Sequence, residues 1–186
     1  MWPRRRYQPR PLWRSLLDLL AFLALLAALT FVLDYLGILD VRGSNARVKD
    51  GDSLVLDGTE VRLWGIDAPE LHQTCSGPSG TYACGKEARA ALGKLIRGQT
   101  ITCRIMDRDR YGRSVSVCRG AANEINMDML RQGWAIAYRN PGFAYLSAEA
   151  EAKSARRGIW QGRFERPEDF RARNRLVIGS MLEADD

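Results

Sequence analysis

The hydrophobic and polar positions of this chain form one long apolar run followed by short alternating segments. Residues 19–33, LLAFLALLAALTFVL, are uncharged and almost wholly apolar. A helix that spans a membrane needs about 20 such residues. The flanking residues extend the run to that length, with Asp18 and Asp34 near its two ends. The pattern therefore predicts a single transmembrane helix over residues 16–39.

From residue 45 onward the apolar positions form short β-rich runs and helical faces. Asp57-Gly58 separates two of these runs and is a strong hairpin signal. Apolar residues three and four apart predict helices over 86–96 and 125–132, and a further helix is expected to start at Ser147 and end before Gly158. The predicted strands cover residues 46–48, 53–56, 60–66, 99–105 and 114–118, and residues 134–138 are expected to be extended.

Short strands in two clusters with helices between them indicate an α+β fold that is mainly a β barrel. We expect an OB-fold, a five-stranded and partly open barrel with about three helices, over residues 45–162. The charged segment 163–186 is expected to run over the surface as a C-terminal extension whose final residues, EADD, are frayed.

Charge gives the apolar segment an orientation. The net charge is +6, and the first 39 residues hold five arginines against two aspartates. Arginines before a membrane helix favour a cytoplasmic N-terminus. We therefore expect residues 1–15 in the cytoplasm and the folded domain on the periplasmic, extracytoplasmic side of a bacterial inner membrane.

Two other interpretations of the apolar segment stay open. A cleaved signal peptide would release a secreted protein, but such peptides have a shorter apolar core followed by small residues, and no clear A-x-A element follows this run. A buried amphipathic helix is the second alternative. The remaining 147 residues are only mildly basic, so a broad surface that coats nucleic acid is not indicated.

Cysteine positions agree with export to an oxidising compartment. Cys75 and Cys84 flank a glycine-rich loop, and Cys103 and Cys118 lie in two predicted strands joined by DRYGR. Loop ends and paired strands are both plausible disulfide geometries, so the pairs 75–84 and 103–118 are favoured, although sequence alone does not fix the connectivity. A four-cysteine zinc site is the alternative, but there is no C-x2-C pair.

Three short segments carry the candidate chemistry: DGDSLVL from Asp50, RLWGIDAPE from Arg62, and DRYGR from Asp109. Carboxylates such as Asp52, Asp67 and Glu70 are the ligands that a hard divalent cation prefers. Arginines such as Arg62 and Arg113 bind phosphate because the guanidinium fork pairs with two oxygens and keeps its proton. A cation site beside a phosphate clamp indicates phosphodiester chemistry.

In this order and at these separations, the three segments resemble the staphylococcal-type thermonucleases, the micrococcal nuclease-like family. LRQGWA (130–135) and AKSARRGIW (152–160) resemble later helical segments of that family. The resemblance covers roughly residues 45–162. It implies an endonuclease that cleaves DNA or RNA with little sequence preference and leaves 3′-phosphates. Together with the apolar N-terminal helix, we expect a membrane-anchored member of the family that is a monomer.

The resemblance also implies roles for individual residues. Asp52, Asp67 and the main-chain carbonyl of Ala68 would bind Ca2+, and Glu70 would position the attacking water. Arg62 and Arg113 would neutralise charge that develops on the phosphate. The residues expected to contact the nucleic-acid substrate are Arg110, Tyr111 and Tyr138.

Each of these charged residues also has an ordinary structural interpretation. Asp52 could be an ordinary turn residue, Arg62 could form a surface ion pair, and Glu70 could be a solvated surface charge. It is improbable that all of these interpretations hold together. His72 is expected to be a loop residue. Because it is the only histidine, the sequence argues against nucleases that need a histidine base or several histidine ligands. Trp64 is expected in the core. The alternative functions are a catalytically silent OB-fold module that binds nucleic acid or protein, and an envelope protein that only presents loops.

Overall fold

The computed structural model describes residues 12–35, 40–139 and 141–183, which divide into two compact units on either side of residue 39. In the first unit, helix α1 (Leu12–Tyr35) contains a stretch, Trp13–Leu33, that is long and apolar enough to cross a membrane. None of that stretch is buried against other residues. The predicted apolar helix is therefore present, while most of the basic segment and residues 36–39 lie outside the described residues.

A six-stranded sheet dominates the second unit, in the order β1-β8-β9-β4-β3-β2. Strands β4 and β9 run parallel and every other neighbouring pair is antiparallel. Asp57 and Gly58 join β3 to β4 with φ angles of 44° and 86°, as the hairpin signal predicted. The strands are β1 (Asp40–Gly43), β2 (Ala46–Val48), β3 (Ser53–Leu56), β4 (Thr59–Leu63), β8 (Ile101–Arg108) and β9 (Ser114–Arg119).

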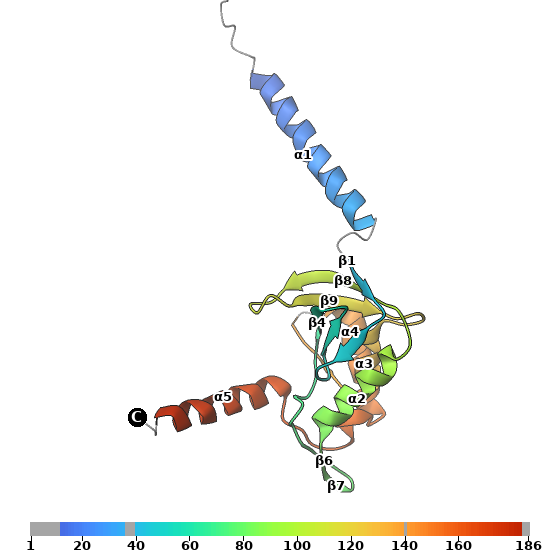
Figure 1. Ribbon diagram of the computed structural model, residues 1–186, viewed down its shortest axis with the longest axis vertical. Helices are drawn as coiled ribbons and strands as arrows, with labels where there is room; N and C mark the ends of the chain where they lie inside the picture. The colour runs from blue at the N-terminus through green and yellow to red at the C-terminus, as the bar shows by residue number, and fades with distance from the viewer. Residues whose placement is uncertain (1–11, 36–39, 140, 184–186) are drawn as a thin grey trace, which may run out of the picture. The chain divides into compact units, whose positions relative to one another are not determined.

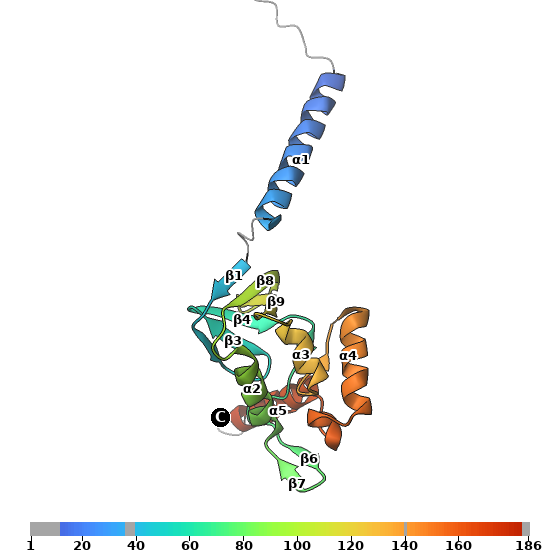
Figure 2. The same cartoon turned by 90° about the vertical axis from the view of Figure 1, so that its right-hand side faces the viewer.

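Most helices of this unit gather beside this sheet (Figures 1 and 2), whereas the C-terminal helix extends away from it (Figure 1), and two short strand pairs complete the unit. The helices are α2 (Cys84–Ile96), α3 (Ile125–Arg131), α4 (Gly142–Ser154), a 3-10 turn η1 (Gly158–Gln161) and α5 (Pro167–Glu183). The short pairs are β5 (Ile66–Asp67) with β10 (Ile136–Ala137), and β6 (Cys75–Gly77) with β7 (Gly80–Tyr82).

The core lies between the sheet and the helices. Alternate residues of the strands, such as Leu54 and Ile101, face inward and meet Leu92 of α2 and Met129 of α3, and all four are fully buried. Each such side chain contributes about 1.5–3 kcal/mol through burial. The mixed α+β fold of OB type predicted from the strand pattern is confirmed, although the sheet gains β1 as a sixth strand.

Three segments differ from the sequence-based prediction. The predicted strand 60–66 is interrupted because Gly65 has a φ of 74°, a left-handed conformation that a strand cannot contain. Helix α4 begins at Gly142 and not at Ser147, because Tyr145 is buried and packs edge-on against Trp64. The segment after residue 162, expected to cross the surface, contains helix α5.

Both predicted disulfides are present. Cys103 and Cys118 are register partners on β8 and β9, with Cα atoms 4.0 Å apart. Cys75 on β6 is bonded to Cys84, the first residue of α2, across a Cα separation of 5.6 Å. One bridge therefore joins two central strands, and the other ties the β6–β7 hairpin to a helix. A zinc site made from the four cysteines is thereby excluded.

Candidate active site

The acidic residues meet where β3, β4 and β5 come together. Asp52 directly precedes β3, and its main-chain oxygen accepts a hydrogen bond from Leu63 N–H at 2.8 Å. Arg62 on β4 pairs in register with Ser53 on β3. The turn at Gly65 then reverses the chain so that Asp67 on β5 lies beside the same strands. Residues separated by up to fifteen positions are thus brought to one point by a hairpin and a turn.

Arg62 joins the two aspartates at the base of the site. Its Nη2 atom lies 2.9 Å from Asp52 Oδ2 and 2.8 Å from Asp67 Oδ1. Asp52 Oδ2 also accepts a hydrogen bond from Ala68 N–H at 3.1 Å. Asp67 is fully buried and Asp52 is 3% exposed. Two carboxylate oxygens from different strands therefore converge on a single cationic nitrogen inside the protein.

Burial changes the ionisation of these groups. It raises the pKa of Asp52 well above its ordinary value; Arg62 opposes this rise, and the nearby carboxylates of Asp50 and Asp67 add to it. Burial also acts to lower the pKa of Arg62, but Asp52 and Asp67 outweigh this effect and raise it. Carboxylates crowded in this way gain from any additional cation that reaches them.

Glu70 lies at the mouth of the site on a loop that is firmly held. Its side chain is 32% exposed, and its N–H donates to Oε1 of the buried Gln73 at 3.2 Å. A Cβ atom at Gly85 would lie 1.8 Å from the Glu70 carbonyl oxygen, so only glycine allows α2 to approach this loop. The carboxylate of Glu70 therefore reaches solvent from a fixed backbone.

A second arginine, Arg171 on α5, enters the site, and the sequence analysis did not find it. Its Nη1 atom lies 3.0 Å from Asp67 Oδ1 and 2.8 Å from Glu70 Oε1, while its Nη2 atom lies 3.0 Å from Asp67 Oδ2. Pro167 followed by Glu168 and Asp169 is a helix-start signal that could have revealed α5. No local pattern could have revealed the contact itself, because Arg171 and Asp67 are 104 residues apart.

Arg113 lies in a different cluster, the turn between β8 and β9. Its Nε donates to Asp109 Oδ2 at 2.7 Å, and its N–H donates to Asp109 Oδ1 at 3.0 Å. Tyr111 is 69% exposed, with the guanidinium carbons of Arg110 and Arg113 at 4.9 and 5.6 Å from its ring centre. Across the described residues, no hydrogen bond or ion pair joins Arg113 to Asp52, Asp67 or Glu70.

The register nevertheless brings the end of this turn close to Arg62. Val115, the second residue of β9, is the parallel partner of Arg62, and Arg113 is the turn residue directly before β9. Although burial acts to raise the pKa of Asp109, hydrogen bonds from Arg113 and from backbone N–H groups lower it.

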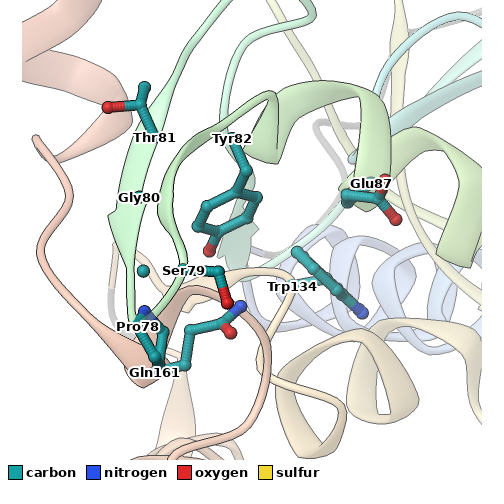
Figure 3. A pocket seen from close by; sticks show the side chains of 9 residues that line it. Pro78, Ser79, Gly80, Thr81, Tyr82, Glu87, Trp134 and Gln161 are labelled. Carbon is teal, nitrogen blue, oxygen red and sulfur yellow. The ribbon is translucent and has the colours of Figure 1, made fainter.

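The remaining candidates make no hydrogen bond or ion pair with these carboxylates among the contacts of the described residues. Tyr138 N–H donates to the Gly65 carbonyl at 2.9 Å, and Arg139 lies over the Tyr138 ring. His72 is exposed, as expected of a loop residue. A pocket beneath the β6–β7 hairpin is lined by Tyr82, Glu87, Trp134 and Gln161, among others, and by none of the acidic-site residues (Figure 3).

The model of the family described as "Staphylococcal nuclease homologue" matches residues 60–162 of this chain, a segment that includes Arg62, Asp67, Glu70 and Arg113. The chain belongs to the staphylococcal nuclease family. It is a nuclease, a hydrolase whose substrate is nucleic acid. The resemblance expected from the three sequence segments is confirmed.

Curated members of the staphylococcal nuclease family are similar over different shares of their length. "Succinoglycan biosynthesis protein ExoI" of Rhizobium meliloti (strain 1021) is 37% identical over 147 residues, which is 76% of each chain. "Probable endonuclease LCL3" of Schizophyllum commune is 38% identical over 133 residues, 61% of this chain and 44% of that protein. An "Uncharacterized endonuclease" of Escherichia coli O157:H7 is 31% identical over 128 residues, 65% of this chain and 78% of the relative.

The donor set of this staphylococcal nuclease homologue fits a hard divalent cation. Asp52 and Asp67 direct oxygens to one point at which a cationic nitrogen now lies, and Ala68 between Asp67 and Glu70 is buried beside them. Buried carboxylate oxygens of this kind suit calcium or magnesium better than softer metals. Both oxygens of Asp67 are engaged by Arg171, so a cation at this site would have to share that carboxylate with this arginine.

Proposed function

We propose that this chain is a calcium-dependent endonuclease that hydrolyses DNA and RNA phosphodiesters with low sequence specificity. The convergence of Asp52 and Asp67 oxygens beside Arg62, with Glu70 at the open edge, supports the proposal. Asp52, Asp67 and the Ala68 carbonyl would hold the cation, which supplies positive charge to the phosphate. Arg62 on β4 would bind the substrate phosphate. The candidate contacts for the rest of the nucleotide are Arg110, Tyr111 and Tyr138.

The reaction assigned to these residues is an in-line displacement at phosphorus. Glu70 orients a water molecule and takes its proton while the water oxygen forms a bond to phosphorus. The bond from phosphorus to the 5′ oxygen breaks, and that oxygen receives a proton from solvent, which gives a 3′-phosphate and a 5′-hydroxyl. Arg62 and Arg113 oppose the negative charge that grows on the phosphate oxygens in the transition state.

We further propose that α1 anchors the enzyme in the cytoplasmic membrane with residues 40–186 on the extracytoplasmic side. The described apolar stretch Trp13–Leu33 supports this orientation together with the arginines that precede it. Two disulfides in the second unit are consistent with an oxidising compartment. Cleavage of the segment would instead give a secreted enzyme, and mass spectrometry of the mature N-terminus distinguishes the two.

A digestion assay tests the activity. The full chain in detergent is incubated with single-stranded DNA and calcium, with and without a chelator, beside the Glu70→Gln variant. We expect cleavage that the chelator abolishes and that Glu70→Gln lowers by about 10³-fold or more, mainly in kcat, because the water loses its base. Binding of DNA without turnover in the wild-type protein would instead support the silent OB-fold module.

A further inference from the structure

Helix α5 contributes a positively charged arginine to the proposed site, although this helix lies outside the segment that matches the family. The match ends at residue 162, whereas Arg171 makes three hydrogen bonds to Asp67 and Glu70. Its side chain is 31% exposed, in contrast with the fully buried Asp67. Arg171 therefore lies at the open side of the site, above the Asp52–Arg62–Asp67 cluster.

The chain that leads into α5 is built into the same loop as Glu70. Gln73 accepts the Glu70 N–H through Oε1 and donates through Nε2 to the Glu165 carbonyl at 2.7 Å. Ser76 and Arg163 exchange two backbone hydrogen bonds, at 2.8 and 3.0 Å. These contacts hold the segment before α5 next to the loop of Glu70. The position of Arg171 therefore follows from contacts of the folded domain.

We infer that Arg171 is a substrate-binding residue of this nuclease, whose guanidinium binds the scissile phosphate together with Arg62. The inference rests on the proposed function. Its geometric basis is that Arg171 Nη1 already lies 2.8 Å from Glu70 Oε1. A phosphorus attacked by a water held on Glu70 must lie within one water of that carboxylate, which places its oxygens within reach of the Arg171 fork.

The contacts of Arg171 with Asp67 show the same pairing that a guanidinium makes with phosphate. Nη1 lies 3.0 Å from Asp67 Oδ1, and Nη2 lies 3.0 Å from Asp67 Oδ2. Phosphate oxygens accept the same bidentate arrangement. Each carboxylate oxygen has two lone pairs, so a divalent cation bound by Asp67 would share this carboxylate with the guanidinium. A phosphate that enters the site would compete with Asp67 and Glu70 for the same guanidinium.

Charge balance supports the assignment. Among the side chains joined by these ion pairs, Asp52, Asp67 and Glu70 carry three negative charges, and Arg62 and Arg171 reduce them to one. A divalent cation and a singly charged phosphodiester then make the site neutral. Arg113, which is proposed to act on the same phosphate, adds one further positive charge, and the resulting excess favours the negative charge that develops in the transition state.

Kinetics of the full chain in detergent test the inference, with calcium and single-stranded DNA as cofactor and substrate. Arg171→Gln is compared with Arg173→Gln, a control two residues further along α5 whose guanidinium pairs with Glu165. We expect Arg171→Gln to lower kcat/KM by about 10²-fold, the cost of one preorganised contact to the transition state. Arg173→Gln should stay within about twofold, since exposed pairs contribute little.

A binding measurement separates contact with phosphate from a structural role. In the Glu70→Gln background with calcium, titration calorimetry compares a dinucleoside monophosphate with its uncharged methylphosphonate analogue. Arg171→Gln should weaken binding of the phosphodiester by about tenfold, the scale of a hydrogen bond to a charged group, and leave the methylphosphonate unchanged. Arg171→Lys, which keeps the charge without the fork, should recover part of the loss.

The outcomes are distinguishable from failure of the proposed function. A wild-type chain that does not cleave contradicts the nuclease proposal itself. If the wild type cleaves and Arg171→Gln cleaves equally well, or loses affinity equally for both ligands, the phosphate contact is wrong. If Arg171→Gln is faster than wild type at low calcium, the inference is also wrong, because Arg171 then acts as a plug that competes with the cation for Asp67.

Discussion

The acidic site around Arg62 and the turn around Arg113 are built in opposite ways. Arg62 pairs with two carboxylates that are almost wholly buried, whereas Arg113 pairs with Asp109 in a turn whose neighbouring Tyr111 is 69% exposed. Charges away from water interact strongly, and exposed charges are screened. The two arginine side chains are about equally exposed, at 20% and 21%, so the difference lies in their partners. Arg62 is held between two buried carboxylates, and Arg113 is held by the single carboxylate of Asp109, which is 18% exposed.

This difference separates two requirements of phosphate chemistry. A guanidinium that must remain in place before the substrate arrives belongs among buried carboxylates, where its position is determined by Asp52 and Asp67. Arg113 lies in the turn directly before β9, near the pairing of Arg62 with Val115, and needs to release only one carboxylate to reach a phosphate. The two arginines can thus be separated experimentally by their effects on stability and on rate.

The largest expected effect is on stability at the buried site. Arg62→Ala leaves the buried carboxylates of Asp52 and Asp67 without this partner, and we expect it to lower the free energy of unfolding by about 3 kcal/mol. Arg171 still pairs with Asp67, which keeps the loss from being larger. Urea denaturation of the full chain in detergent measures the change. A loss below about 1 kcal/mol would show that Arg62 is not needed to balance these carboxylates.

The next effect is on rate at the exposed turn. Arg113→Ala should lower kcat/KM by about 10²-fold, because one charge contact to the transition state is lost. Its unfolding free energy should change by less than about 1 kcal/mol, because water still reaches both members of this pair, at 21% and 18% exposed. Asp109→Asn is the matched variant: it keeps Arg113 but removes the carboxylate that orients it. A large fall in stability with unchanged kcat/KM for Arg113→Ala would reverse the comparison.

Local pattern was enough to predict most of this fold. Hydrophobic patterns with periods of two and 3.6 residues predicted elements that the structure contains. These elements are the strands 53–56 and 114–118, the Asp57-Gly58 hairpin and the helix ending at Ile96. The error at Ser147 has a tertiary cause. The burial of Tyr145 against Trp64 extends α4 toward its N-terminus, and no charge pattern within the helix records that contact.

The candidate site could be predicted in part for a similar reason. Asp52, Arg62, Asp67 and Glu70 lie within nineteen consecutive positions, so a hairpin and a turn are enough to unite them. Arg113 needs the parallel pairing of β4 with β9, and the resemblance to the family supplied that information. Arg171 lies 104 residues from Asp67, and although the start of α5 has a recognisable signal, nothing in this charged segment indicates which side chains it contacts.

The smallest expected effect concerns Arg110, which shares the exposed turn but makes no ion pair among those found in the described residues. Its guanidinium lies 4.9 Å from the centre of the Tyr111 ring, an exposed contact that contributes about 0.5–1 kcal/mol. Arg110→Ala should therefore raise KM by only about two- to fivefold through a less ordered Tyr111, with kcat unchanged. Steady-state assays beside Arg113→Ala measure both constants. An Arg110→Ala loss in kcat as large as that of Arg113→Ala would mean that the whole turn, and not one arginine within it, contacts the reacting phosphate.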